Sequence, residues 1–155
     1  MKLNKLVLAA ALAGAAYLGL APAVRTSAPP QADLRPEAAK LQPDNADAAL
    51  ENAYLNRLRH HQVSGSGTVI KLLADDNDGS RHQRFLLRLN SGRTLLISHN
   101  IDLAPRIESL QPGDTVEFNG EYEWNAKGGL VHWTHHDPQG RHVTGWLRHR
   151  QRTYQ

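Results

Sequence analysis

The sequence of 155 residues contains no cysteine. This absence excludes a structural disulfide, a thiolate metal site and a catalytic thiol. It also excludes a lipid anchor attached to an N-terminal cysteine. We therefore expect a fold that is held together by its hydrophobic core alone.

Acidic residues are missing from the end of the chain, because none follows Asp137. The same stretch contains four arginines, Arg141, Arg148, Arg150 and Arg152. The formal net charge of +3 also includes Lys2 and Lys5, whereas acids outnumber bases between residues 63 and 140. A protein that binds nucleic acid through charge carries a basic face over its folded domain. The charge pattern therefore gives nucleic-acid binding little support.

Several catalytic signatures are also missing. The sequence has no Gly-x-Ser-x-Gly elbow of the serine hydrolases. Residues 76–79 are similar to a calcium loop, but Ala74 and Phe85 occupy two of the ligand positions. No asparagine follows Asn125, although an HNH-type nuclease needs one after its first histidine pair. An enzyme would therefore have to use a less familiar arrangement of residues.

The N-terminal residues are typical of an export signal. Two lysines precede an almost wholly apolar run at residues 6–20, and residues 21–23 supply the small side chains that signal peptidase reads. The run is shorter than the roughly 20 apolar residues of a membrane span. We predict a signal peptide at residues 1–23, cleavage before Val24 and a periplasmic protein. The alternatives are an uncleaved N-terminal anchor or a secreted protein, and no other transmembrane segment is predicted.

The rest of the chain divides into four parts. Residues 24–44 are rich in proline and alanine and are expected to form a disordered linker. Residues 45–62 show apolar side chains at helical spacing after a residue that can cap a helix. A β domain is expected at residues 63–147, followed by a basic tail at residues 148–155. We expect the helix to pack on the β domain, with docking of a partner protein as the alternative.

From Gly65 onward, apolar residues alternate with polar ones, which is typical of strands. The expected strands are residues 68–73, 82–89, 94–98, 116–124 and 130–135, with a further short strand around 143–147. Apolar residues at 101–110 suggest a short helix between the third and fourth strands, which Pro105 would confine. This element order is that of the OB-fold, a small five-stranded barrel. We predict an all-β OB-like barrel, with a generic antiparallel barrel or sandwich as the alternative.

Four of the nine histidines and an aspartate lie between residues 132 and 142. Imidazoles combined with a carboxylate suit Zn²⁺ or another divalent metal. The candidate metal ligands are His132, His135, His136 and His142. On an extended chain, however, the adjacent His135 and His136 point apart. The alternative is a polar loop whose histidines bond to the backbone and to Asp137.

The alternation of side chains along a strand also places His132. If Val131 and Trp133 face the core, His132 faces outward. It then shares the outer surface with Glu121 and Glu123 of the preceding strand. We therefore expect these three side chains to lie together on the barrel.

His99 is a second candidate for chemistry. Asn100 can cap the short helix expected there and Asp102 suits its first turn, but His99 has no such structural role. If His99 lies near His135 and His136, the three imidazoles could serve a metal-dependent hydrolase. The catalytic candidates are His99, His135, His136 and Asp137.

Arg84 and Arg88 share one face of the second strand, with Leu86 between them. This strand belongs to the usual ligand-binding face of an OB-fold, and arginine binds phosphate, carboxylate or sulfate. Base stacking is disfavoured, because Phe85 is the sole aromatic residue of the first three strands. The alternative is a solvated face paired with glutamates across the sheet. The ligand-binding candidates are Arg84, Arg88, Glu121, Glu123, His132 and His142.

About half of the chain resembles a bacterial family of small exported proteins catalogued as domain of unknown function 3465. The matching strings are residues 98–107, 113–114, 120–125, 127–129 and 132–138. The resemblance implies an exported domain with an OB-like barrel and implies no activity. From the arginines of the second strand and the histidine-rich segment, we predict an exported domain that binds a charged ligand through these two parts. A metal-dependent hydrolase of phosphoesters or similar substrates is the alternative, and a partner-docking module is a third.

Overall fold

The computed structural model describes residues 43–155. The predicted signal peptide and nearly all of the predicted linker lie outside these residues. Among the residues described, no helix has the length and apolar character needed to span a membrane.

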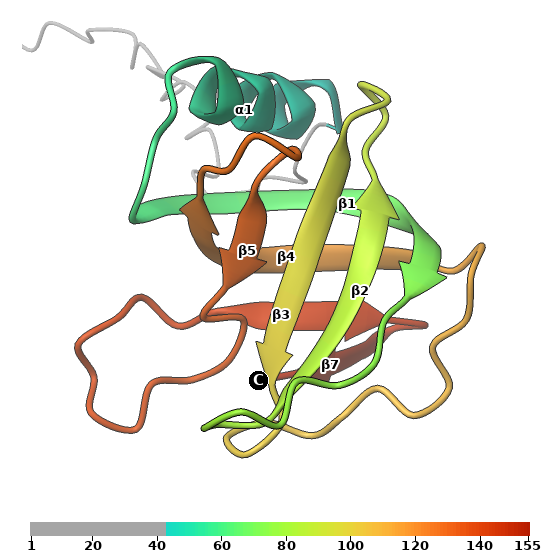
Figure 1. The fold of residues 1–155 in the computed structure, drawn as a ribbon, viewed down its shortest axis with the longest axis vertical. Coiled ribbons are helices and arrows are strands. Elements are labelled where there is room, and N and C mark those ends of the chain that lie inside the picture. The colour runs from blue at the N-terminus through green and yellow to red at the C-terminus, as the bar shows by residue number, and fades with distance from the viewer. Residues whose placement is uncertain (1–42) are drawn as a thin grey trace, which may run out of the picture. The chain divides into compact units, whose positions relative to one another are not determined.

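Five strands form a closed barrel in the order β1-β2-β3-β5-β4, and β4 pairs back onto β1 (Figure 1). The strands are β1 (His61–Leu72), β2 (His82–Arg88), β3 (Thr94–Asn100), β4 (Thr115–Glu123), β5 (Leu130–His132), β6 (Trp146–His149) and β7 (Arg152–Tyr154). Neighbouring barrel strands are antiparallel, except that β3 and β5 are parallel. The predicted all-β architecture with a five-stranded barrel is therefore confirmed.

The barrel strands alternate between buried and partly exposed side chains. In β2, β3 and β4 every second residue is buried, so one face of each strand lines the interior. The fully buried side chains include Phe85, Leu87, Leu95, Ile97, Val116, Phe118, Tyr122 and Val131. The opposite faces of the strands remain on the surface of the barrel, where their side chains are available to bind a ligand.

Strand β1 is longer than the sequence predicted, because it includes residues 61–67. This stretch has a low strand propensity, since it contains Gly65 and Gly67 together with Ser64 and Ser66. A Cβ atom at Gly65 would lie 2.9 Å from both Leu50 Cδ1 and Phe118 Cζ. Glycine has a low strand propensity, but at this position its missing side chain lets the helix and the core approach the β1 backbone closely.

The helix α1 (Pro43–Leu55) lies across one end of the barrel (Figure 1). Its side chains Leu50 and Ala53 are buried in the core, and Glu51 forms two hydrogen bonds with Arg93, of 2.6 and 2.8 Å. The helix ends earlier than predicted because Arg57 and His60 have φ angles of 52° and 50°, which are incompatible with a right-handed helix. The expected packing of the helix on the β domain is therefore observed.

The short helix predicted between the third and fourth strands is wrong, because residues 101–114 form turns instead. Pro105 has no N–H to donate within a helix. The buried Gln83 side chain holds this segment by donating to the Ile107 carbonyl at 3.0 Å and accepting from the Ile107 amide at 2.9 Å. Ile107 and Leu110 are buried without being helical.

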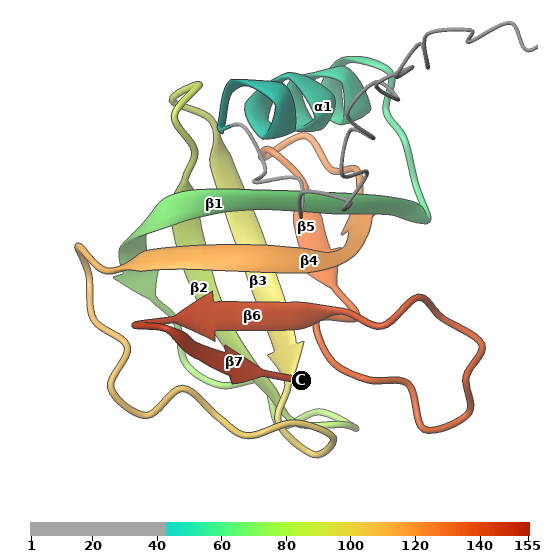
Figure 2. The same cartoon turned by 180° about the vertical axis from the view of Figure 1, so that it is seen from behind.

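The residues expected to form a basic tail instead belong to the β6–β7 hairpin, which continues the sheet beside β4 (Figure 2). The buried His149 ring lies with Nε2 2.9 Å from Asp114 Oδ2, and Arg150 donates to the same carboxylate at 3.1 Å. The fifth strand also ends sooner than predicted, at His132. Trp133, with a φ of 49°, breaks the strand and therefore does not face the core.

Candidate functional site

A groove lies on the outer surface of β2 and β3. Leu86 of β2 stands directly opposite Leu96 of β3, and both side chains are only partly buried. The groove has a volume of about 530 Å³, within the usual range for small-molecule sites. Its lining residues are Leu73, Leu86, Thr94, Leu96, Asn125, Ala126, Lys127 and Gly129. The floor is therefore aliphatic, with a few polar groups around it.

The loop between β4 and β5 forms one wall of the groove and is fixed by its own hydrogen bonds. Asn125 Oδ1 accepts from the amides of Lys127 at 2.9 Å and Gly129 at 3.3 Å. Gly129 has a φ of 100°, and a Cβ atom there would meet the Tyr122 ring at 2.2 Å. Only glycine fits this position, because both the backbone angle and the close approach exclude a side chain. The wall is thus held in place before any ligand arrives.

Three exposed cations lie beside the groove. Lys127 comes from the loop, Lys71 of β1 pairs with Leu86, and Arg88 of β2 pairs with Thr94. Paired residues on neighbouring strands point to the same side of the sheet, so Lys71 and Arg88 stand on the groove side. The groove therefore has an aliphatic floor and a positive rim.

Arg84, which the sequence grouped with Arg88, has a different environment. Its guanidinium donates twice to the Ala74 carbonyl, at 3.1 and 3.2 Å, and once to Asp76 at 3.3 Å. These bonds attach the β1–β2 connection to β2. Of the two arginines, Arg88 is the exposed one and Arg84 is held by the protein itself.

The histidine-rich segment forms a loop that leaves and rejoins the same edge of β4, between β5 and β6 (Figure 2). The Gly145 amide donates to the His135 carbonyl at 3.1 Å and closes the loop. The Asp137 carboxylate accepts from the amides of Gln139, Arg141 and His142 at 2.7–3.1 Å. These bonds, the one from Gln139 above all, lower the pKa of Asp137. Asp137 thus organises the loop.

His99 and His135 are buried and already have hydrogen-bond partners. His99 Nδ1 lies 2.8 Å from Thr134 Oγ1, and Nε2 lies 3.2 Å from the Pro105 carbonyl, to which it donates. Burial lowers the pKa of His99 to about 4, so the ring is neutral near pH 7. His135 Nδ1 donates to the His136 carbonyl at 2.8 Å.

The remaining catalytic candidate, His136, is exposed on the loop. The structure places the His99 ring beside Thr134, the residue that precedes His135. Within residues 43–155, however, the three predicted imidazoles do not offer ligand atoms close enough to hold one ion. The predicted hydrolase site thus has no metal-binding geometry at these residues.

A different cluster forms on the outer surface of β4 and β5, and we call it the histidine–glutamate cluster. It consists of His60, Glu121, Glu123, His132 and His142. The β4–β5 register places His132 opposite Glu121, with Nε2 3.5 Å from Glu121 Oε1. His142 Nδ1 lies 3.4 Å from Glu121 Oε2. The predicted grouping of His132 with the two glutamates is therefore present in the structure.

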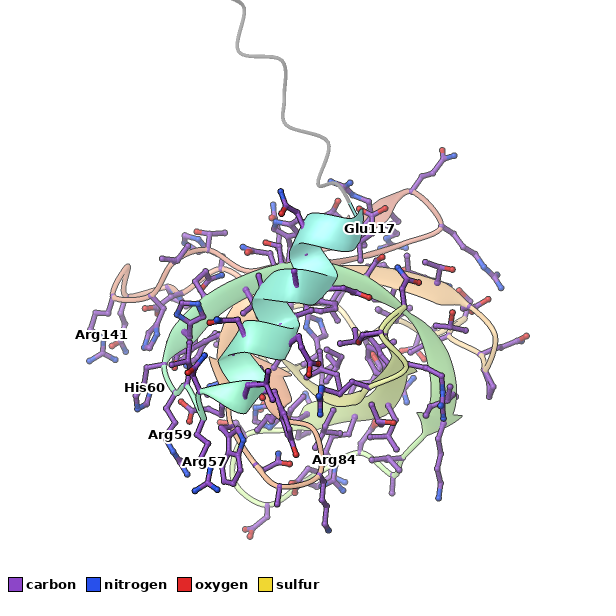
Figure 3. All side chains as sticks on the ribbon, turned by 90° about the horizontal axis from the view of Figure 1, so that it is seen from above. Arg57, Arg59, His60, Arg84, Glu117 and Arg141 are labelled. Carbon is purple, nitrogen blue, oxygen red and sulfur yellow. The ribbon has the colours of Figure 1, made fainter. Side chains whose placement is uncertain are left out.

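His60 completes this cluster, although no sequence pattern pointed to this residue. Its Nδ1 lies 3.0 Å from Glu121 Oε1 and 2.9 Å from Glu123 Oε1, while its amide donates to Glu123 at 3.0 Å. In Figure 3, His60 and Arg141 lie toward the same side of the barrel, away from Arg84. The groove and the histidine–glutamate cluster share no residue, so the strand face and histidine loop do not make one site.

The charges within the cluster influence one another. Burial acts to raise the pKa of Glu121, but the hydrogen bond from His60 and the neighbouring His132 and His142 outweigh it, so the pKa is lowered. The hydrogen bond to Glu121 and the charge of Glu123 raise the pKa of His60. Burial lowers the pKa of His132, which favours its neutral form. The cluster thus combines a Glu121 carboxylate that favours its ionised form with a partly buried His132 imidazole that favours its neutral form.

A search of curated proteins found no match to this chain. One protein family, described as "Protein of unknown function (DUF3465)", matches residues 37–155, which include α1 and every strand of the barrel. The match covers most of the chain and agrees with the resemblance carried by the sequence strings. The chain therefore belongs to this family of unknown function.

Proposed function

We propose that this domain binds a small amphipathic anion in the groove on β2 and β3. The observation that carries the proposal is the combination of an aliphatic floor with a rim of exposed cations, formed by Lys71, Arg88 and Lys127. The apolar part of the ligand would lie on the leucines, and its anionic group would face the rim. Charge on the rim selects the sign of the ligand, while burial of the apolar part supplies most of the affinity.

The elements that line the groove support a binding role. In OB-folds, ligands bind on the second and third strands, between the loops that join strands 1 to 2 and 4 to 5. Here the same parts contribute, with Leu73 from the β1–β2 connection and Asn125 to Gly129 from the β4–β5 loop. None of the described residues that line this groove is aromatic, whereas base stacking on single-stranded nucleic acid needs aromatic platforms. We therefore favour an aliphatic ligand over an oligonucleotide.

The proposal is tested by calorimetric titration with four probes: decanoate, decyl sulfate, decyltrimethylammonium and acetate. We expect the two long-chain anions to bind, because they combine a chain for the leucines with a negative group for the rim. Acetate lacks the chain and the ammonium compound has the wrong charge, so both should bind more weakly. Equal binding of the long-chain anion and cation would contradict the role of the rim.

Two substitutions locate the binding. Leu86→Gln places a polar group in the floor and should weaken decanoate binding by a factor of about 10 or more, since burying a leucine is worth about 1.5–3 kcal/mol. Lys127→Glu should weaken decanoate binding and strengthen binding of the cationic probe. The controls are Leu103→Gln, which makes the same apolar-to-amide change, and Arg141→Glu, which makes the same reversal of charge, both at exposed positions outside the groove. If the controls lose as much affinity as the groove variants, the ligand binds elsewhere.

A further inference from the structure

The histidine–glutamate cluster collects its side chains from four separate parts of the chain. β4 supplies Glu121 and Glu123, β5 supplies His132, the connection from α1 to β1 supplies His60, and the β5–β6 loop supplies His142. All five side chains approach from the outer surface of the barrel. Their convergence therefore makes no contribution to the hydrophobic core, which lies on the other face of β4.

The two glutamates lie on the same face of β4, two residues apart, so their charges repel one another. The ligand atoms of His60, Glu121 and Glu123 all lie within 4.8 Å of one another. Three imidazoles in contact with two carboxylates form a nitrogen and oxygen donor set, which suits Zn²⁺ better than Mg²⁺ or Ca²⁺. A divalent cation at this position would neutralise both carboxylates.

His132 provides an independent indication of a missing partner. Its Nε2 atom is inaccessible to solvent and has no hydrogen-bond partner within the described part of the chain, and buried polar atoms of this kind are rare. It lies 3.5 Å from Glu121 Oε1, which is long for a hydrogen bond. The buried nitrogen therefore faces a carboxylate of the cluster without forming a hydrogen bond to it.

The ring of His142 is also held in position. It stacks on Trp133, with ring centroids 3.6 Å apart and an interplanar angle of 14°. Its amide donates to Asp137, whose carboxylate organises the whole loop. His142 Nδ1 then lies 3.4 Å from the second oxygen of Glu121. An imidazole fixed in this way can orient a ligating carboxylate, which is a common feature of zinc sites.

We propose that the histidine–glutamate cluster is a binding site for a divalent transition-metal ion, Zn²⁺ in the first instance. His60 Nδ1 and the carboxylates of Glu121 and Glu123 coordinate the ion, while His132 Nε2 faces Glu121 and His142 orients it. The site differs from the one predicted from sequence, because it uses His60 and the two glutamates in place of His135 and His136. It is also separate from the groove, so it does not depend on the ligand proposed there.

The test is a calorimetric titration of the full-length chain, purified without a histidine tag and freed of metal with a chelator. Zn²⁺ should bind at one ion per chain, and Mg²⁺ should not compete. Glu121→Gln and His60→Ala should each lower the zinc affinity by a factor of at least about 10. The His60 side chain is 80% exposed, so its removal leaves the fold intact. Circular dichroism confirms the fold of each variant.

Two neighbouring histidines provide matched controls. His61→Ala removes the exposed imidazole next to His60, and His136→Ala removes the exposed one in the loop. Both variants should bind zinc as the unchanged chain does. Absorption of the Co²⁺-loaded protein in the visible range should report a tetrahedral site that is lost in Glu121→Gln. No zinc binding, or equal losses in His60→Ala and His61→Ala, would overturn the proposal.

Discussion

At the scale of single residues, the surroundings of His99 determine its chemistry. Its ring is fully buried, and both nitrogens have protein partners in Thr134 and Pro105. With its pKa lowered to about 4 by burial, the ring cannot accept a proton near neutral pH. His99 therefore stabilises the barrel in its neutral form and is a poor general base.

This environment predicts a pH dependence of stability. The unfolded chain binds a proton at His99 near its ordinary pKa of 6.5, whereas the folded chain resists protonation down to about 4. Stability should be unaffected by His99 above pH 6.5 and should fall as the pH drops from 6.5 to 4. The total loss should be up to about 3 kcal/mol.

The measurement is urea unfolding of the unchanged chain and of His99→Gln between pH 4 and 7.5. Glutamine can donate to Pro105 and accept from Thr134 without titrating, so the variant should lose less stability on acidification. If the free energy of unfolding fell equally with pH in the two proteins, His99 would titrate with its ordinary pKa. A pKa near 6.5 for the His99 ring, measured by NMR, would contradict the account directly.

The candidate sites show which residues a sequence can reveal. The pairing of His132 with Glu121 and Glu123 follows from strand alternation and from adjacent strands, both of which are local patterns. His60 could not be found in this way, because it reaches the cluster from 61 residues away through a turn with positive φ. His99 and His135 were predicted to be catalytic, yet burial and hydrogen bonds give them structural roles.

At the scale of elements, α1 is part of the folded domain. Its Leu50 side chain is 1% exposed and packs beside Phe118 over Gly65. The turn between β2 and β3 is also attached to the helix, because the Ser91 amide donates to Asp47 at 2.7 Å. A detachable docking arm would have neither contact, so the structure favours packing over the partner-docking alternative.

Leu50→Ala should therefore destabilise the whole domain by about 2–5 kcal/mol, because it leaves a cavity between the helix and the barrel. Leu55→Ala is the matched control, since Leu55 is 68% exposed and its truncation should change stability little. Urea unfolding followed by tryptophan fluorescence measures both. If the two variants were equally stable, α1 would be an arm with no contribution to the core.

The elements that the sequence predicted well are those with strict alternation, β2, β3 and β4. Elements shaped by contacts between distant parts of the chain were predicted poorly. In the first half of β1, Gly65 lets Leu50 and Phe118 approach the strand backbone, and residues 101–114 are held by Gln83 rather than by helical hydrogen bonds. Neither contact is visible in a local pattern.

At the scale of the whole molecule, we propose that the protein works outside the cytoplasm. The proposal rests on residues 1–23, which resemble a cleavable export signal. When the full-length chain is expressed in a Gram-negative host, it should be recovered from the periplasm with Val24 as its first residue. Mass spectrometry of the purified protein tests this directly. Recovery of the uncut chain in the membrane fraction would replace cleavage by anchoring, and an uncut cytoplasmic protein would contradict export.

The barrel also keeps its two candidate sites apart, since the groove lies on β2 and β3 and the histidine–glutamate cluster on β4 and β5. Ligand binding in the groove should therefore be unchanged by Glu121→Gln. Because the two sites are separate, loss of zinc binding at the cluster should leave ligand binding in the groove intact.

An NMR titration of the ¹⁵N-labelled protein with decanoate shows directly whether the groove on β2 and β3 binds a ligand. We predict that amide shifts will concentrate in β2, β3 and residues 124–129, which surround the groove. Residues 133–145 should be spared. Shifts confined to that loop, or none at all, would contradict the claim that the groove is the binding site.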